Sequence, residues 1–204
     1  MKTELYQQVV MTSLGKKTCI CLNSIGYHLV LDGEENRGDP HRLLNHDEVR
    51  EYLNRMNDVV LCATDCGLNR DDEVKLAFNA ETLVLHLFRY ICRIHGIERY
   101  TKLRELRTVR CWNRRLGSLE GLQNCPDLHT LIIPCNSVKD LTPIAKLPIR
   151  CLDISQNPVR SFSGLDFSKL ETLMIDPHQL KALGEVGELP SLTRLEFDGQ
   201  VKKN

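Results

Sequence analysis

The chain has 204 residues, of which 42% are hydrophobic and 26% are charged, a composition typical of globular proteins. Its 27 basic and 27 acidic side chains cancel, which argues against a general affinity for nucleic acid or anionic membranes. No apolar run approaches the roughly 18 residues of a membrane span, and the N-terminus lacks the apolar core of a secretory signal. We therefore expect an intracellular protein, cytoplasmic or nuclear.

The first part of the chain contains short elements without a regular period. Residues 3–14 predict a short helix, while 19–22 and 27–31 predict two strands joined by a turn, which favours a hairpin. Residues 32–40 carry the turn-forming sequence of a loop. A capping box that begins at Asn45 predicts the start of a second helix.

The residue types that carry chemistry form no metal or catalytic motif. The chain has nine cysteines, an odd number, so they cannot all form disulfides with one another. Cys62 and Cys66 are separated by three residues, whereas paired zinc ligands usually have the spacing C-x2-C. His41 and His46 flank a loop without a serine or cysteine motif to act with. We predict mostly free thiols in a reducing compartment, with no metal, no cofactor and no enzymatic activity.

After residue 100 the sequence repeats the pattern L-x-x-L-x-L-x-x-N-x-L in five copies, whose starts are 21 or 22 residues apart. The x-L-x-L-x core alternates with period two, which predicts a short strand with its leucines pointing inward. One copy cannot bury its own apolar face, so neighbouring copies must stack. The copies start at Leu106, Leu128, Ile149, Leu170 and Leu192. The predicted strands are 108–111, 130–133, 151–154, 172–175 and 194–197.

An asparagine follows the strand in two copies, at Asn136 and Asn157, where the chain must turn. Its amide can hydrogen-bond backbone groups that the turn leaves unpaired. His178 takes this position in the fourth copy, and we interpret it as a hydrogen-bonding replacement for asparagine.

The second halves of the copies read Gly121-Leu122, Pro143-Ile144 and Gly164-Leu165. With these residues the sequence resembles the 22-residue class of leucine-rich repeats, found in a type-1 protein phosphatase regulator, a dynein light chain and a spliceosomal subunit. The resemblance implies an α/β fold, a right-handed leucine-rich repeat solenoid. Parallel strands would line its concave face, with short turns or helical segments on the convex face. From the irregular first part of the chain we also expect an N-terminal α/β cap.

We divide the chain into a cap, residues 1–55, and a repeat domain, residues 56–204. Within the repeat domain, 106–197 are regular and 56–105 hold degenerate repeats, one of them starting near residue 81. Solenoid ends need polar caps. The residues after 197 are too few for another repeat, so they either cover the last edge with charge or lead into further chain.

Outward residues of the predicted strands would form one continuous surface about 20 Å long, since strands step by about 4.8 Å. Exposed apolar groups on it exceed what a solvated face needs, and tryptophan and arginine are enriched at interface hot spots. Arginines gather at one end of this surface and acidic residues at the other. The candidate binding residues are Arg107, Arg110, Trp112, Ile132, Pro134, Asp153, Met174, Asp176 and Glu196.

The sequence thus predicts a non-enzymatic module that binds another protein on its concave face, as an adaptor or regulatory subunit. The alternative is an RNA- or ribonucleoprotein-associated subunit, because Trp112 lies among five arginines and an aromatic ring can stack on a base. The zero net charge and the acidic far end argue against RNA as the main ligand.

Overall fold

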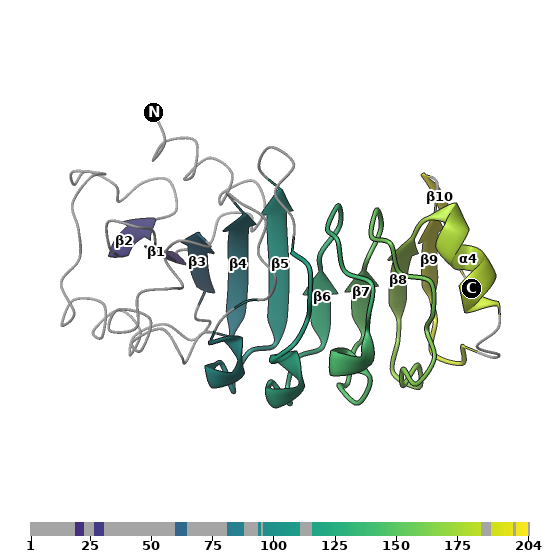
Figure 1. Cartoon of the computed structure of the whole chain (residues 1–204), viewed down its shortest axis with the longest axis horizontal. Helices are drawn as coiled ribbons and strands as arrows, with labels where there is room; N and C mark the ends of the chain where they lie inside the picture. The colour runs from purple at the N-terminus through teal and green to yellow at the C-terminus, as the bar shows by residue number, and fades with distance from the viewer. Residues whose placement is uncertain are drawn as a thin grey trace.

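The fold is a row of short strands stacked side by side, and in the regular repeats the chain between successive parallel strands crosses the opposite side (Figure 1). In this computed structural model the described residues are 19–22, 27–30, 60–64, 81–87, 94, 96–110, 116–184, 189–197 and 199–203. The strands are β1 (Cys19–Leu22), β2 (Tyr27–Val30), β3 (Val60–Thr64), β4 (Thr82–Leu87), β5 (Glu105–Arg110), β6 (Thr130–Ile132), β7 (Cys151–Asp153), β8 (Thr172–Ile175), β9 (Arg194–Phe197) and β10 (Gln200–Lys203).

All the described strands belong to one sheet, in the order β10-β9-β8-β7-β6-β5-β4-β3-β1-β2. The pairs from β3 to β9 are parallel, and the pair of β1 with β3 is parallel as well. Only the two ends are antiparallel, where β2 pairs with β1 and β10 pairs with β9. The predicted parallel sheet with one strand per repeat is confirmed across residues 103–197.

Leucines in one register hold the repeats together. Leu106, Leu131, Leu152 and Leu173 are Cα partners on successive strands, and each is almost fully buried. Burying one such side chain contributes about 1.5–3 kcal/mol, so the stack is stabilised by a term that grows with every repeat. Leu83 of β4 continues the same row, which places a strand in the degenerate repeat expected near residue 81.

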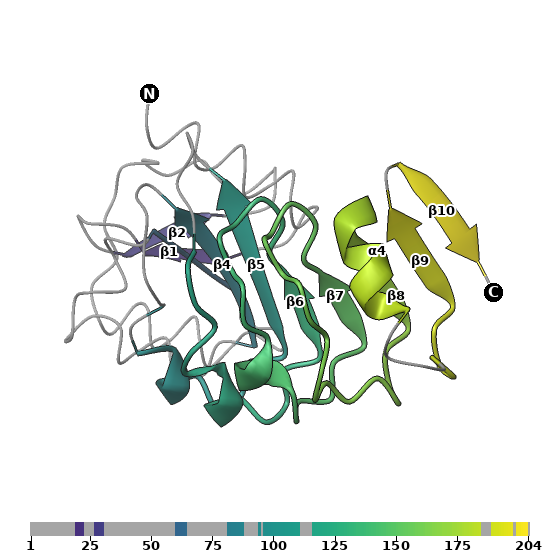
Figure 2. The ribbon, with the colours of Figure 1, turned by 45° about the vertical axis from the view of Figure 1, so that its right-hand side comes forward.

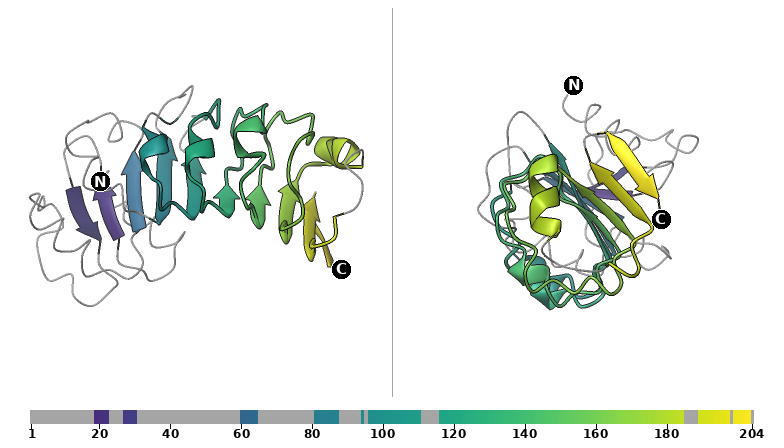
Figure 3. Two further views of the ribbon diagram at one scale, coloured as in Figure 1. Left: turned by 90° about the horizontal axis from the view of Figure 1, so that it is seen from below. Right: turned by 90° about the vertical axis from the view of Figure 1, so that its right-hand side faces the viewer.

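The side opposite the sheet is made of short helical segments and extended loops (Figures 2 and 3). The buried apolar side chains form the core between the two sides. The segments are the 3-10 helices η2 (Ile97–Arg99), η3 (Leu122–Asn124) and η4 (Thr142–Ile144) and the α-helix α4 (Pro177–Leu183). Gly121 begins η3 with φ of 101°, and a Cβ there would lie 2.5 Å from the Ile97 side chain. Glycine is therefore required at this position both by its backbone angle and by the close approach of the neighbouring coil.

The register predicted for the first strand is wrong by three residues. The sequence pattern starts the first copy at Leu106, but Leu106 pairs with Leu131, so Leu103 is the residue equivalent to Leu128. The strand runs over Glu105–Arg110 instead of 108–111. Thr108 consequently points inward, where it is 8% exposed and takes the place that Ile133 has in the next repeat.

The two turn asparagines are buried and bond to backbone groups of two repeats, as predicted. Asn157 Oδ1 accepts the Val138 N–H at 3.0 Å, and its Nδ2 donates to the carbonyl oxygens of Ile133 and Ile154 at 2.8 and 3.2 Å. Asn136 likewise accepts the Leu116 N–H at 2.7 Å and donates to Ile133 O and Thr108 Oγ1.

The interpretation of His178 is wrong, because Gln179 does the work of asparagine in the fourth repeat. Gln179 is fully buried, and its Nε2 donates to the carbonyl oxygens of Ile154 and Asn157 at 3.2 and 3.0 Å. Its Oε1 accepts the Asp176 N–H at 2.8 Å. Here the turn is replaced by α4, which shifts the inward position by one residue and leaves the His178 side chain 53% exposed.

Beyond these repeats, β1 and β2 form the predicted antiparallel hairpin. The predicted helices at 3–14 and after Asn45 lie outside the described residues, and the division at residue 55 stays a prediction. At the other end, β10 pairs with β9 through a two-residue turn, so these residues cover the edge of β9.

Candidate interaction surface

The outward side chains of β5 to β9 form two parallel rows, and we call this surface the sheet face. It is continuous because every one of these strands is parallel and in register with its neighbour. The middle row contains Arg107, Ile132, Asp153, Met174 and Glu196. The row before it contains Glu105, Thr130, Cys151, Thr172 and Arg194.

The accessible part of this surface begins at β5. On β4 the outward positions of the same two rows are held by Thr82 and Val84, which are only 7% and 0% exposed. Glu105 and Arg107, their neighbours on β5, are partly exposed. The sheet is therefore open to a partner over β5 to β9 and closed at β4.

Ile132 and Met174 are partly exposed apolar side chains in the middle row, two strands apart, with Asp153 between them. Val201 of β10 extends the row, since it is paired with Glu196, and it is 45% exposed. Sequence reasoning missed Val201, although the Asp198-Gly199 dipeptide before it is a strong hairpin signal. Apolar groups grouped on one face in this way are a feature of binding surfaces.

Ion pairs within single strands reduce the charge gradient that the sequence suggests. Arg107 forms an ion pair with Glu105, and Arg194 with Glu196 at 2.8 Å. Glu105 is absent from the predicted surface because the three-residue error in register left it outside the predicted strand. The Leu103-x-x-Leu106 spacing would have placed it on the strand. The basic end is thus partly neutralised, and the uncompensated charge on the sheet face is acidic.

Asp153 lies deeper than predicted, with only 8% exposure at an outward position. Its Oδ1 accepts hydrogen bonds from the Ser155 N–H at 3.0 Å and the Ser155 hydroxyl at 2.7 Å. Burial raises the pKa of this carboxyl above its usual value, the Ser155 hydrogen bonds lower it, and the negative charges of Glu196 and Asp176 raise it further. The ionised carboxylate of Asp153 therefore lowers the stability of the folded state.

We expect Asp153→Asn to stabilise the protein at pH 7, because the amide keeps an acceptor for Ser155 and carries no charge. The raised pKa makes the folded wild type bind its proton at higher pH than the unfolded chain does. The advantage of the variant should accordingly be full above the folded pKa. It should fall as the pH drops through that value and vanish below the ordinary value of about 3.8. Urea melts across this range measure it, and an unchanged or lower midpoint at pH 7 would contradict the expectation.

The structure brings together five of the nine predicted binding residues, those of the middle row. Arg107 takes the position beside Ile132 that the sequence pattern gives to Arg110, which ends β5. Pro134 and Asp176 follow the ends of β6 and β8, and Asp176 caps α4 while its Oδ2 accepts the Gln156 N–H at 2.6 Å. Trp112 lies outside the described residues, as does the side chain of Arg110.

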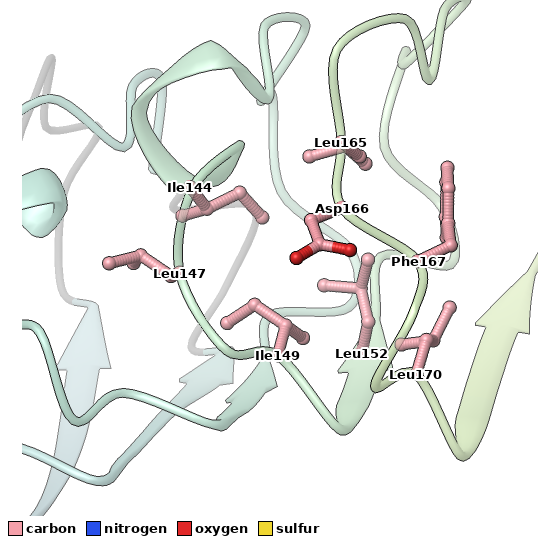
Figure 4. A pocket seen from close by; sticks show the side chains of 8 residues that line it. All are labelled: Ile144, Leu147, Ile149, Leu152, Leu165, Asp166, Phe167 and Leu170. Atoms are coloured by element: carbon pink, nitrogen blue, oxygen red, sulfur yellow. The ribbon is translucent and has the colours of Figure 1, made fainter. Parts of the chain in front are cut away.

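A small apolar cavity in the described part lies between the second and third repeats (Figure 4). Its lining is Ile144, Leu147, Ile149, Leu152, Leu165, Asp166, Phe167 and Leu170, most of it from the buried core. Over the described ranges there is no cluster of histidine, cysteine and carboxylate side chains suited to a metal ion. No helix among those residues is long and apolar enough to cross a membrane. The sheet face is therefore the strongest candidate site.

No protein family and no curated protein matches the sequence. A solved structure that does match is an internalin from Listeria monocytogenes, a leucine-rich repeat protein, with a TM-score of 0.54 and 17% sequence identity. The fold is a leucine-rich repeat fold. The match covers 78% of this chain and 53% of the internalin chain, so this chain spans about half of that protein's length.

Proposed function

We propose that this leucine-rich repeat protein recognises another protein through its sheet face, as an adaptor or regulatory subunit, and that it works inside the cell in the cytoplasm or nucleus. The observation that carries this proposal is the pair Ile132 and Met174. Both are partly exposed in the middle row of a continuous, hydrogen-bonded sheet, with an ionisable group between them. A rigid apolar centre with a polar surround is the usual arrangement of a binding interface.

Binding of RNA is the weaker alternative on this surface. Arg107 and Arg194 are each paired with a carboxylate of the same strand, and Asp153 and Asp176 add negative charge. A phosphate backbone would be repelled by these acidic groups, while a protein partner with its own basic side chains would be attracted.

The experiment that tests this function begins with the purified chain as bait in a cell extract treated with nuclease. A retained protein is identified by mass spectrometry, and its binding is then measured with pure components at several salt concentrations. We expect binding that survives nuclease and depends weakly on salt. If the protein instead neutralised five phosphates of an RNA, a plot of log affinity against log salt concentration would have a slope of about −3.5. Such a slope, or loss of all binding with nuclease, would favour the RNA alternative and contradict a protein partner.

A further inference from the structure

The middle row of the sheet face sets an acidic group between two apolar ones. Asp153 on β7 is the register partner of Ile132 on β6 and of Met174 on β8. All three point outward, but the two apolar side chains are partly exposed while Asp153 is 92% buried, with 8% exposure. Asp153 is thus less exposed than the two apolar side chains beside it.

This carboxyl has no cationic partner among the described residues. The arginines of the two rows, Arg107 and Arg194, pair with Glu105 and Glu196. Its hydrogen bonds come from Ser155, and both reach a single oxygen, Oδ1. A buried carboxylate without a counter-charge is costly, and a cation delivered from outside would offset that cost. Asp176 and Glu196 add to the negative potential at this place.

Building on the proposed function, we infer that the partner inserts a lysine or arginine side chain between Ile132 and Met174 to pair with Asp153. The aliphatic stem of such a side chain would contact Ile132 and Met174 while its charged end reaches the carboxylate. Apolar residues next to it in the partner then cover Ile132, Met174 and, farther along the row, Val201. The partner is thus a protein segment that combines one basic side chain with apolar neighbours.

A negatively charged or purely apolar partner segment fits this surface less well. An acidic segment would face Asp153, Asp176 and Glu196, and each close like-charge contact is unfavourable. A purely apolar segment would cover Asp153 and remove the remaining water from a carboxylate without a counter-charge. Charge complementarity therefore selects the basic segment among the possible occupants.

The test is a selection of random peptides, displayed on phage, on the purified full chain. We expect the enriched peptides to carry an arginine or lysine beside apolar residues. Their affinity should fall at least tenfold on Asp153→Asn and should be unchanged on Asp127→Asn, an exposed acidic residue in the turn before β6. Replacing the basic peptide residue by alanine should weaken binding to the wild-type chain but should hardly change the affinity for Asp153→Asn. This double-mutant cycle isolates the interaction between the basic residue and Asp153.

A second variant, Ile132→Ser combined with Met174→Ser, separates the two proposals. The contrary outcome is that the peptides lose binding to this double variant and yet bind Asp153→Asn with the same affinity as wild type. That result would overturn the inferred basic side chain opposite Asp153 and leave the sheet face as the binding surface. If no selected peptide is sensitive to either variant, both the inference and the proposed function are overturned. Circular dichroism melts confirm that each variant is folded.

Discussion

Asn157→Ala should destabilise the protein by about 1–3 kcal/mol, the cost of leaving buried hydrogen-bonding groups unpaired. The side chain is 2% exposed and joins two repeats, because it accepts the Val138 N–H and donates to Ile133 O. Alanine leaves the Val138 N–H without a partner in a place that water reaches poorly, and Ile133 O keeps only its bond from Asn136. A urea melt followed by circular dichroism measures the loss of unfolding free energy.

The fourth repeat supplies a matched pair of controls. His178 aligns with Asn157 in the sequence pattern but is exposed, so His178→Ala should leave the unfolding free energy within about 0.5 kcal/mol of wild type. Gln179 carries the equivalent bonds to Ile154 and Asn157, so Gln179→Ala should behave like Asn157→Ala. The opposite order, with His178 the costly position, would mean that the turns are built differently from this account.

Met174→Lys should weaken binding of the identified partner by about thirtyfold or more, equivalent to about 2 kcal/mol. Met174 is the apolar side chain next to Asp153 and is partly exposed, so it lies where a partner must approach. A lysine there removes the apolar contact and competes with the partner for the negative charge of Asp153. Titration calorimetry with pure components measures the affinity.

Ser163→Lys is the control for this substitution. Ser163 is exposed, and its loop lies on the side opposite the sheet, where the next residues pack against the segment after η4. The same added charge at this position should leave the affinity unchanged. Equal loss in the two variants would point to a general effect of charge, and loss in Ser163→Lys alone would place the site on the opposite side.

The regular repeats could be predicted from sequence because their physical requirements are local. An alternating pair of apolar residues specifies a strand, and the spacing between copies specifies the stack, so β6 to β9 fall within one residue of the predicted windows. Asn136 and Asn157 were predictable for the same reason, since a sharp turn always leaves backbone groups to satisfy.

The errors arise where two local solutions compete. In the first copy Leu103, Leu106 and Val109 all fit the pattern, and only pairing with β6 selects Leu106 as the partner of Leu131. In the fourth copy Pro177 favours a helix start, which moves the inward position from His178 to Gln179. Position alone also gave no sign that Asp153 would be buried, because that depends on the side chains of neighbouring strands.

The most direct measurement places a photo-cross-linking amino acid, benzoylphenylalanine, at position 174 and separately at position 163 of the full chain. After irradiation in complex with the purified partner, adducts are located by mass spectrometry. Binding on the sheet face predicts a covalent adduct with the partner from position 174 and none from position 163. An adduct from position 163 with none from position 174 would contradict the account, because the partner would then lie on the side of the solenoid opposite the sheet.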